Sequence, residues 1–417
     1  MARSLAKDAI PTGWKYDLLD KFAIRCSGHT PSKSFPEYWD GGIKWISLAD
    51  SFRLDQGYVY ETEKEISEAG IANSSAELHP AETVVLSRDA GIGKSGVMAE
   101  PMAVSQHFIA WKCDNTEKLN SWFLYNWLQL NKAEFERQAV GSTIKTIGLP
   151  YFKKLKIAVP PYSEQKKIAK ILSTWDKAIT TTEQLLANSQ QQKKALMQQL
   201  LTGKKRLLDE NGIRFSGEWK KVRLGTVADM NSGGTPKSNI EEYYGGNIPW
   251  VSIADMTKQG KWIASTEKYL TELGLENSSA RIYPKDSVLY AMYASIGECS
   301  IAQVPLSSSQ AILGIRPKSE LNFEFLYFFL NSLKEKIKLQ GQQGTQSNLN
   351  AGMVKDFLLY LPGMEEQKKI AAVLCTADQE ISALQQKLDA FKQEKKALMQ
   401  QLLTGKRRVK IDNKEVA

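Results

Sequence analysis

The chain has 417 residues, of which 42% are hydrophobic and 24% are charged, and these proportions exclude a disordered or membrane-embedded protein. A chain of this length exceeds what one hydrophobic core organises, so two or more domains are expected. The formal net charge of +9 favours association with a polyanion without identifying it.

Export signals and metal-binding patterns are both missing from the sequence. The N-terminal segment MARSLAKDAIPT contains no apolar run, and no stretch of about 18 uninterrupted apolar residues occurs. The four cysteines (Cys26, Cys113, Cys299 and Cys375) stand far apart, and the three histidines form no HxxxH or Cys/His cluster. We therefore expect a cytoplasmic protein with reduced thiols and no metal site.

Residues 1–162 predict a first β-rich domain. Short β-branched and aromatic runs, such as Lys44–Leu48 and Thr83–Ser87, are separated by Gly, Pro, Asn and Ser, which indicates a mixed sheet with irregular loops. One helix is expected at Ser121–Gln138, and its large hydrophobic side chains are interpreted as core packing. The segment Gly91–Gly96 matches a nucleotide-binding GxGxxG pattern, but no long helix follows it, so we interpret it as a tight turn between strands.

Residues 163–204 predict a first spacer helix. From Ser163 to Thr202 the chain contains no Gly or Pro, and Gly203 closes the segment. A helix of about 40 residues is about 60 Å long. Apolar residues recur along it at heptad spacing, which is typical of a helix that pairs with another helix. This apolar seam comprises Ile168, Leu172, Trp175, Ile179 and Leu186.

The second half of the chain repeats the first. The segment KKALMQQLLTGK at Lys193–Lys204 recurs without change at Lys395–Lys406, and a looser match relates Trp45–Asp50 to Trp250–Asp255. The repeat therefore predicts a second β-rich domain at 205–363, a second spacer helix at 364–406 and a basic tail at 407–417. The second domain is expected to contain a strand at Ser287–Ala291 and a helix at Asn322–Leu339. The second seam comprises Ile370, Leu374, Ile381, Leu384 and Leu388.

Two seams of equal length favour pairing of the helices with each other over packing of each helix on its own domain. The connection from Lys204 to about Gly217 is too short to run back along a helix of about 60 Å, so the second domain begins near the end of the first helix. Antiparallel pairing then places the domains at opposite ends of the helix pair. The predicted fold class is α+β, with two β-rich domains separated by two long helices that pair as an antiparallel coiled coil.

The loops of the two domains carry different polar side chains. Arg, Lys, Asn, Gln and polar or aromatic side chains read base edges in the major groove of DNA, whereas a solvated loop side chain is the alternative at each position. The candidates in the first domain are Lys33, Ser34, Arg88, Lys94, Thr143 and Lys145. Those in the second domain are Lys237, Ser238, Tyr293, Gln346 and Asn348.

No catalytic site is evident in the sequence. Glu164-x-Lys166 resembles part of a nuclease motif, but no Pro-Asp pair precedes it, and no amino-methyltransferase motif or histidine-containing triad is present. The basic clusters that follow the spacer helices, Lys204–Arg206 and Lys406–Arg408, could reach phosphates or could equally be solvated.

These features together resemble the specificity subunits of type I restriction-modification enzymes. Each unit of about 200 residues contains a Gly-x-Thr-Pro element, a Trp-Ile/Val-Ser element, Glu-Gln-Lys-Lys-Ile-Ala after a Pro-containing exit, and Leu-Leu-Thr-Gly-Lys at the helix end. The resemblance covers nearly the whole chain, except the first dozen residues and the tail after Arg408.

The resemblance implies a DNA-binding subunit without catalysis of its own. Each target-recognition domain would read one half of a split, asymmetric double-stranded DNA sequence, and the paired helices would set the gap. Two modification subunits with adenine methyltransferase activity would dock on this chain, and restriction subunits with ATP-dependent endonuclease activity would join them. The resemblance also implies that this chain binds no cofactor itself, and that S-adenosylmethionine, ATP and Mg are bound by the partners.

Overall fold

The computed structural model describes residues 10–113, 118–141, 145–293, 295–342 and 349–411. The chain forms two compact units. The first unit contains residues 1–183 and 386–417, and the second contains residues 184–385. The two long helices, α5 (Tyr162–Leu200) and α11 (Met364–Leu402), each begin in one unit and end in the other.

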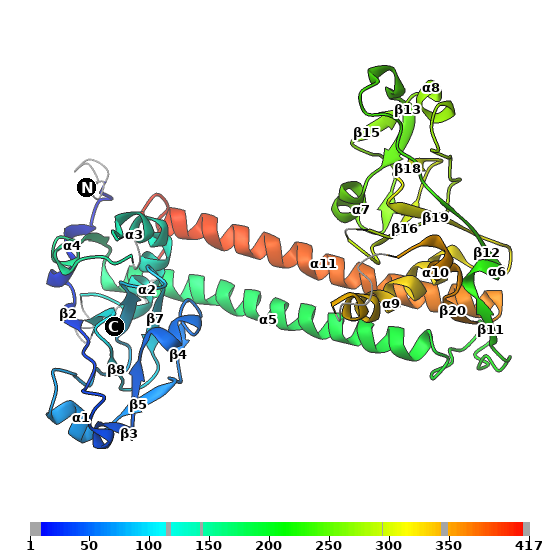
Figure 1. Cartoon of the computed structure of the whole chain (residues 1–417). Coiled ribbons are helices and arrows are strands. Elements are labelled where there is room, and N and C mark those ends of the chain that lie inside the picture. Colours follow the sequence, from blue (N-terminus) through cyan, green and yellow to red (C-terminus); the bar gives the residue numbers. More distant parts are fainter. Residues whose placement is uncertain (1–9, 114–117, 142–144, 294, 343–348, 412–417) are drawn as a thin grey trace. The chain divides into compact units, whose positions relative to one another are not determined.

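The first unit contains three small sheets (Figure 1). The five-stranded sheet has the order β2 (Ile24–Ser27), β9 (Phe108–Lys112), β6 (Val84–Ser87), β7 (Ser95–Met98) and β4 (Tyr58–Val59). The three-stranded sheet has the order β5 (Lys64–Ile66), β3 (Trp39–Ile46) and β8 (Ala103–Val104), and β1 (Lys15–Leu18) pairs with β10 (Lys156–Val159). Helical segments are η2 (Leu19–Lys21), η3 (Pro36–Tyr38), η4 (Leu48–Phe52), α1 (Glu68–Ala72), α2 (Ser121–Leu130), α3 (Lys132–Gln138) and α4 (Leu149–Lys153).

The second unit repeats this topology strand for strand. Its five-stranded sheet has the order β12 (Ala228–Ser232), β19 (Ile312–Pro317), β16 (Val288–Ala291), β17 (Cys299–Ala302) and β14 (Trp262–Ile263). Its three-stranded sheet has the order β15 (Lys268–Leu270), β13 (Tyr244–Val251) and β18 (Ser307–Ser308), and β11 (Lys220–Arg223) pairs with β20 (Leu358–Leu361). Its helical segments are α6 (Leu224–Val227), η5 (Glu241–Tyr243), α7 (Ile253–Gln259), α8 (Glu272–Glu276), α9 (Phe323–Gln342) and α10 (Ala351–Lys355).

Two local expectations for the first unit have different outcomes. The turn predicted at Gly91–Gly96 is confirmed, because it joins the antiparallel strands β6 and β7, and Gly91 and Gly93 both adopt φ of 79°. The single helix predicted at Ser121–Gln138 is wrong, because the chain breaks at Asn131 into α2 and α3. The Asn131 side chain donates a 2.7 Å hydrogen bond to the Trp127 carbonyl and so ends α2.

The hydrophobic core of each unit combines sheet, domain helix and long helices. In the first unit, Trp111 and Phe123 belong to one buried cluster with Leu172 of α5 and Leu402 of α11. In the second, the corresponding cluster contains Leu200 of α5 and Leu374 of α11. All ten of the proposed seam residues are buried or half-buried. The long helices are therefore part of each core.

The long helices pair in opposite directions within each unit. In the first unit, Lys395 of α11 forms an ion pair with Asp176 of α5, and the rings of Trp175 and Phe391 meet edge to face at 5.6 Å. In the second unit, Lys193 of α5 forms the equivalent ion pair with Asp378 of α11. The start of one helix thus lies against the end of the other, and the fold is the predicted α+β class with an antiparallel helix pair.

The repeated Glu-Gln motif fixes the start of each long helix. Gln165 accepts a 2.7 Å bond from the Asn120 backbone N–H and donates 2.9 Å bonds to the carbonyls of Lys118 and Pro160. Gln367 makes the same three kinds of bond at the start of α11. These buried amides attach each long helix to the loop that precedes the domain helix, which explains their recurrence.

Candidate nucleic-acid interface

Three loops of the first unit meet at the end of β6. The Arg88 backbone N–H donates to the His107 carbonyl at 3.0 Å, and the Arg88 carbonyl accepts from the Ile147 N–H at 2.9 Å. Asp89, the next residue, accepts a hydrogen bond from the Thr146 hydroxyl and lies 2.5 Å from Nδ1 of His107. Hydrogen bonds therefore join the loops that carry Arg88 and Lys145, two of the predicted DNA-contacting residues.

A fourth loop joins this group in both units. The Thr30 hydroxyl of the Gly-x-Thr-Pro element hydrogen-bonds Gln106, and Thr235 makes the same bond with Gln310 in the second unit. Lys33 and Ser34 follow Thr30 along the chain and are exposed. We call the meeting point of these loops the loop cluster of each unit. In the first unit it comprises the segments 28–34, 88–94, 105–107 and 145–147, and in the second it comprises the equivalent loops around Thr235, Met292, Gln310 and Leu349.

The loop cluster of the second unit has the same backbone bonds with different side chains. The Met292 N–H donates to the Ala311 carbonyl at 2.9 Å, and the Leu349 N–H donates to the Met292 carbonyl at 3.2 Å. Tyr293 is 39% exposed here. It lines a hollow of about 620 Å³ together with Gln310 and Asn350. The two loop clusters therefore share their backbone hydrogen bonds but expose different side chains.

The motif residues next to the loop clusters have structural roles. Ser47 and Asp50 form a capping box at the start of η4, and Ser252 and Asp255 do so at α7. The indole N–H of Trp45 donates to the His29 carbonyl at 3.0 Å. The Trp-Ile/Val-Ser element therefore builds the scaffold.

The predicted base-reading residues occupy different environments. Lys33, Ser34, Lys145, Lys237 and Ser238 are exposed, whereas Arg88 and Lys94 are half-buried. The Lys94 ammonium donates to the Ser51 carbonyl at 3.0 Å, and Nε of Arg88 lies 3.7 Å from Asp89. Among the described carboxylates, none lies within 4 Å of the ammonium groups of Lys33, Lys145 or Lys237. Thr143, Gln346 and Asn348 lie outside the described residues.

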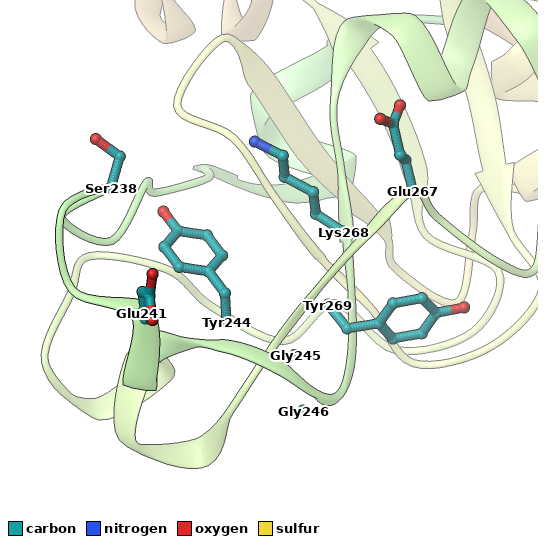
Figure 2. Close-up of a pocket in the computed structure, with 8 residues that line it drawn as sticks. All are labelled: Ser238, Glu241, Tyr244, Gly245, Gly246, Glu267, Lys268 and Tyr269. Atoms are coloured by element: carbon teal, nitrogen blue, oxygen red, sulfur yellow. The ribbon is translucent and has the colours of Figure 1, made fainter.

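Ser238 also lines a hollow of its own in the second unit. This hollow measures about 590 Å³. Figure 2 shows Ser238, the Tyr244 hydroxyl and the Lys268 ammonium beside one another at its edge. Glu241 and Glu267 line it too, so its charge is mixed and does not favour a phosphate.

The loop clusters also contain three residues that the sequence did not predict as DNA contacts: Gln106, His107 and Gln310. The recurrence of Ser105-Gln106 as Ser309-Gln310 was the available signal. A second unexpected group is Cys26, Glu77 and His79, whose side chains come together in the first unit although the sequence pattern predicted no metal site.

The basic residues after the long helices make intramolecular contacts. The Arg206 guanidinium holds Glu366 through bonds of 2.6 and 2.7 Å, and Arg408 holds Glu164 through two bonds of 2.7 Å. Both carboxylates are buried, and these pairs raise the pKa of each arginine. The pairs leave Lys204, Lys205, Lys406 and Arg407 as the basic side chains that could meet phosphates.

Comparison with known proteins identifies the class to which this twofold architecture belongs. The family described as type I restriction modification DNA specificity domain matches residues 11–188 and again residues 216–393. The chain therefore belongs to this family and contains two copies of its domain. No helix in the described part of the chain is long and apolar enough to cross a membrane.

Two relatives from the same organism are similar to this chain, one over part of its length and the other over nearly all of it. The specificity subunit of type I restriction enzyme MjaIX of Methanocaldococcus jannaschii is 32% identical over 164 residues, which is 39% of this chain and 38% of the relative. The MjaVIII specificity subunit of the same organism is 28% identical over an alignment of 430 positions, covering 96% of this chain and 94% of the relative.

A solved structure shares the fold of the chain. The type I restriction-modification S subunit from M. genitalium superimposes with a TM-score of 0.58 at 16% identity. The superposition covers 96% of this chain and 97% of that structure. This likeness extends across both domains and both long helices.

Proposed function

We propose that this chain is the sequence-specific DNA-binding subunit of a type I restriction-modification enzyme, and that each unit reads one half of a bipartite, asymmetric site. One observation carries the proposal. The two copies of the specificity domain share strand order and backbone bonds, but their loop clusters carry different side chains. The position of Arg88 in the first unit is occupied by Met292 in the second, and Tyr293 follows it. A shared scaffold with different contact residues supports recognition of two different half-sites.

The helix pair is proposed to set the gap between the half-sites. Helices α5 and α11 each contain 39 residues, which corresponds to about 58 Å of helix. Two weak binding sites on a stiff spacer gain affinity through effective concentration, and they lose it when the half-sites are shifted out of register. A fixed helix length therefore favours one gap.

The chemistry is proposed to belong to partner subunits. Two modification subunits would dock on this chain and supply S-adenosylmethionine-dependent adenine methylation, and restriction subunits would supply the ATP- and Mg-dependent motor and nuclease. Because DNA is the proposed ligand, the expected compartment is the cytoplasm.

An exchange of one domain tests the modular proposal. Residues 14–160 are replaced by the corresponding domain of another family member, and the sequences methylated by the reconstituted complex are then determined. We expect only one half of the recognised sequence to change, and exchange of residues 219–362 to change the other half. A change in both halves, or in neither, would refute the proposal.

The isolated chain distinguishes two other functions. Methylation or cleavage by the purified chain alone would identify an enzyme, whereas we expect these activities only with partners. Binding without sequence preference and with a shallow salt dependence would identify a mere assembly scaffold.

A further inference from the structure

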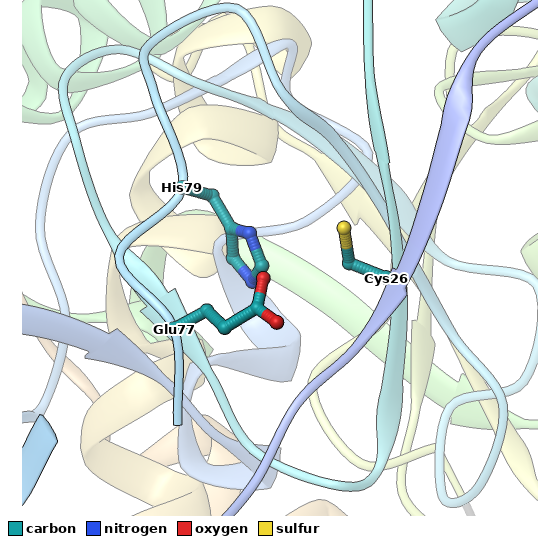
Figure 3. A group of neighbouring side chains, drawn as sticks. All are labelled: Cys26, Glu77 and His79. Atoms are coloured by element: carbon teal, nitrogen blue, oxygen red, sulfur yellow. The ribbon is translucent and has the colours of Figure 1, made fainter. Parts of the chain in front are cut away.

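Three side chains with metal-binding chemistry converge in the first unit. Cys26 lies on β2, and Glu77 and His79 lie in the segment between α1 and β6 (Figure 3). A thiol sulfur, a carboxylate oxygen and an imidazole nitrogen all lie within 4.8 Å of one another. The ligand atoms of a tetrahedral zinc ion lie about 3.3–3.8 Å apart, so small side-chain rotations bring these three into range.

His79 is the residue whose burial needs an explanation. Its side chain has 0% exposure, and neither ring nitrogen has a hydrogen-bond partner among the described residues. A buried polar group without a hydrogen-bond partner is costly, and a ligand bound to the ring would remove this cost.

The second unit replaces the same three positions with a self-sufficient hydrogen-bonded group. His79 bridges to Met102 as Tyr283 bridges to Leu306, and Cys26 pairs with Ala110 as Asn231 pairs with Gly314. The Tyr283 hydroxyl donates to the Asn231 carbonyl at 2.9 Å, and Arg281 donates to the Asn231 side chain at 3.4 Å. The shared fold therefore does not require a cysteine and an unpartnered histidine there.

We propose that Cys26, Glu77 and His79 form a binding site for a zinc-class divalent cation in the first unit only. Thiolate, imidazole and carboxylate form a ligand set that suits Zn²⁺, and three protein ligands leave a fourth position for water. The Lys112 ammonium lies 3.3 Å from the Glu77 carboxylate, and an ion bound to Glu77 would replace this ion pair. The Lys112 side chain is 22% exposed, so solvent is accessible to it.

A bound ion would fasten the edge of the main sheet of this unit. Strand β2 is the outermost strand of the five-stranded sheet, and it leads directly into the loop that carries Thr30 and Lys33. Linking β2 to the segment 77–79 would restrict this loop, whereas the loop of the second unit would be unaffected. The ion would thus stabilise one loop cluster and not the other.

Metal binding by the full chain tests the proposal directly. The protein is freed of metal with a chelator, and Zn²⁺ affinity is measured by competition with a chromophoric chelator. We expect one ion per chain, with affinity at least tenfold weaker after Cys26→Ser or Glu77→Gln. With Co²⁺ as the probe, we expect a near-ultraviolet sulfur-to-cobalt absorption band that Cys26→Ser abolishes.

Matched controls separate this site from adventitious binding. Cys375→Ser removes a half-buried thiol of the second unit and should leave both readouts unchanged. Glu77 is 59% exposed, so Glu77→Gln should fold normally, which circular dichroism checks. Failure of the parent chain to bind Zn²⁺, or equal affinity in the parent and Glu77→Gln chains, would overturn the proposal.

Discussion

Glu164 and Glu366 show why single residues recur in the two halves of the chain. Each carboxylate is buried at the start of a long helix and is held by an arginine that follows the end of the other long helix. A buried charge persists only when it is paired and hydrogen-bonded, and a bidentate guanidinium satisfies both needs. Trp219 adds a 3.0 Å bond from its indole N–H to Glu366.

Removing the arginine should therefore expose the cost of the buried carboxylate. Arg206→Met leaves Glu366 without its bidentate partner, and we expect a loss of about 3 kcal/mol in the free energy of unfolding. Urea unfolding of the intact chain measures this loss. Arg407→Met, at an exposed position with the same change in net charge, should change the free energy of unfolding by less than about 0.5 kcal/mol. Equal effects of the two substitutions would contradict the structural role of Arg206.

Lys145 was selected from the sequence as a base-reading candidate, but we infer that its exposed ammonium contacts a phosphate instead. It is exposed in the loop cluster of the first unit, and no described carboxylate pairs with it. Lys145→Ala should weaken binding of cognate and noncognate DNA by similar factors and should reduce the slope of log affinity against log salt by about 0.9. Fluorescence anisotropy at several salt concentrations measures both quantities. A loss confined to one DNA sequence would instead assign Lys145 to base reading.

The residues that sequence patterns could not reveal are those joined across long separations. Arg408 and Glu164 are 244 positions apart, and Cys26 and His79 come from different segments around the main sheet. Neither group has a characteristic local spacing, because tertiary structure alone brings the members together. Arg88 and Lys145 could be selected by residue type, but their common location depends on backbone bonds at His107 and Ile147.

At the level of elements, the helix pair is defined by both apolar and charged contacts. The two ion pairs Asp176–Lys395 and Lys193–Asp378 occupy equivalent positions in the two units. Lys193 and Lys395 continue the heptad spacing seven residues beyond Leu186 and Leu388, and a charged residue at such a position contributes to register more than to stability. These lysines therefore favour the antiparallel alignment in which each meets an aspartate.

A charge exchange tests this alignment. Asp176→Lys places two ammonium groups opposite each other, and we expect it to reduce stability by about 1 kcal/mol or less, because Asp176 is 41% exposed. Combining it with Lys395→Asp restores opposite charges and should recover most of the loss. Thermal unfolding of the single and double variants gives the coupling energy. Additive losses would show that the pair does not contribute to the register.

Elements with local signals were the predictable ones. Heptad spacing and Gly203, which adopts φ of 72° after the first helix, are local signals: both long helices start within one residue of the predicted position and end four residues before the predicted end. The strand order of the sheets has no such signal, because register in a mixed sheet depends on contacts between distant segments. The break at Asn131 was missed because its side-chain bond to Trp127 competes with a continuous apolar pattern.

At the scale of the whole molecule, the first unit is assembled from both ends of the chain. Leu402 and Leu403 belong to the same core as Trp14, and Arg408 donates to the Thr12 carbonyl at 2.7 Å. Each unit therefore depends on both long helices for its core. A change in the length of only one helix should disturb the units themselves, whereas a matched change in both can leave them intact.

Matched insertions test the proposed link between helix length and DNA gap. Four residues inserted after Glu183 and four after Gln385, at the boundaries between the units, lengthen each helix by about 6 Å and by a little more than one turn. Because successive base pairs are about 3.4 Å apart, we expect the preferred gap to increase by about two base pairs. Methylation of DNA substrates with graded gaps, using the reconstituted complex, measures this preference.

An insertion in α5 alone should weaken methylation at every gap, since the helices then pair out of register. A preferred gap that stays the same after the double insertion would show that the helices do not set it.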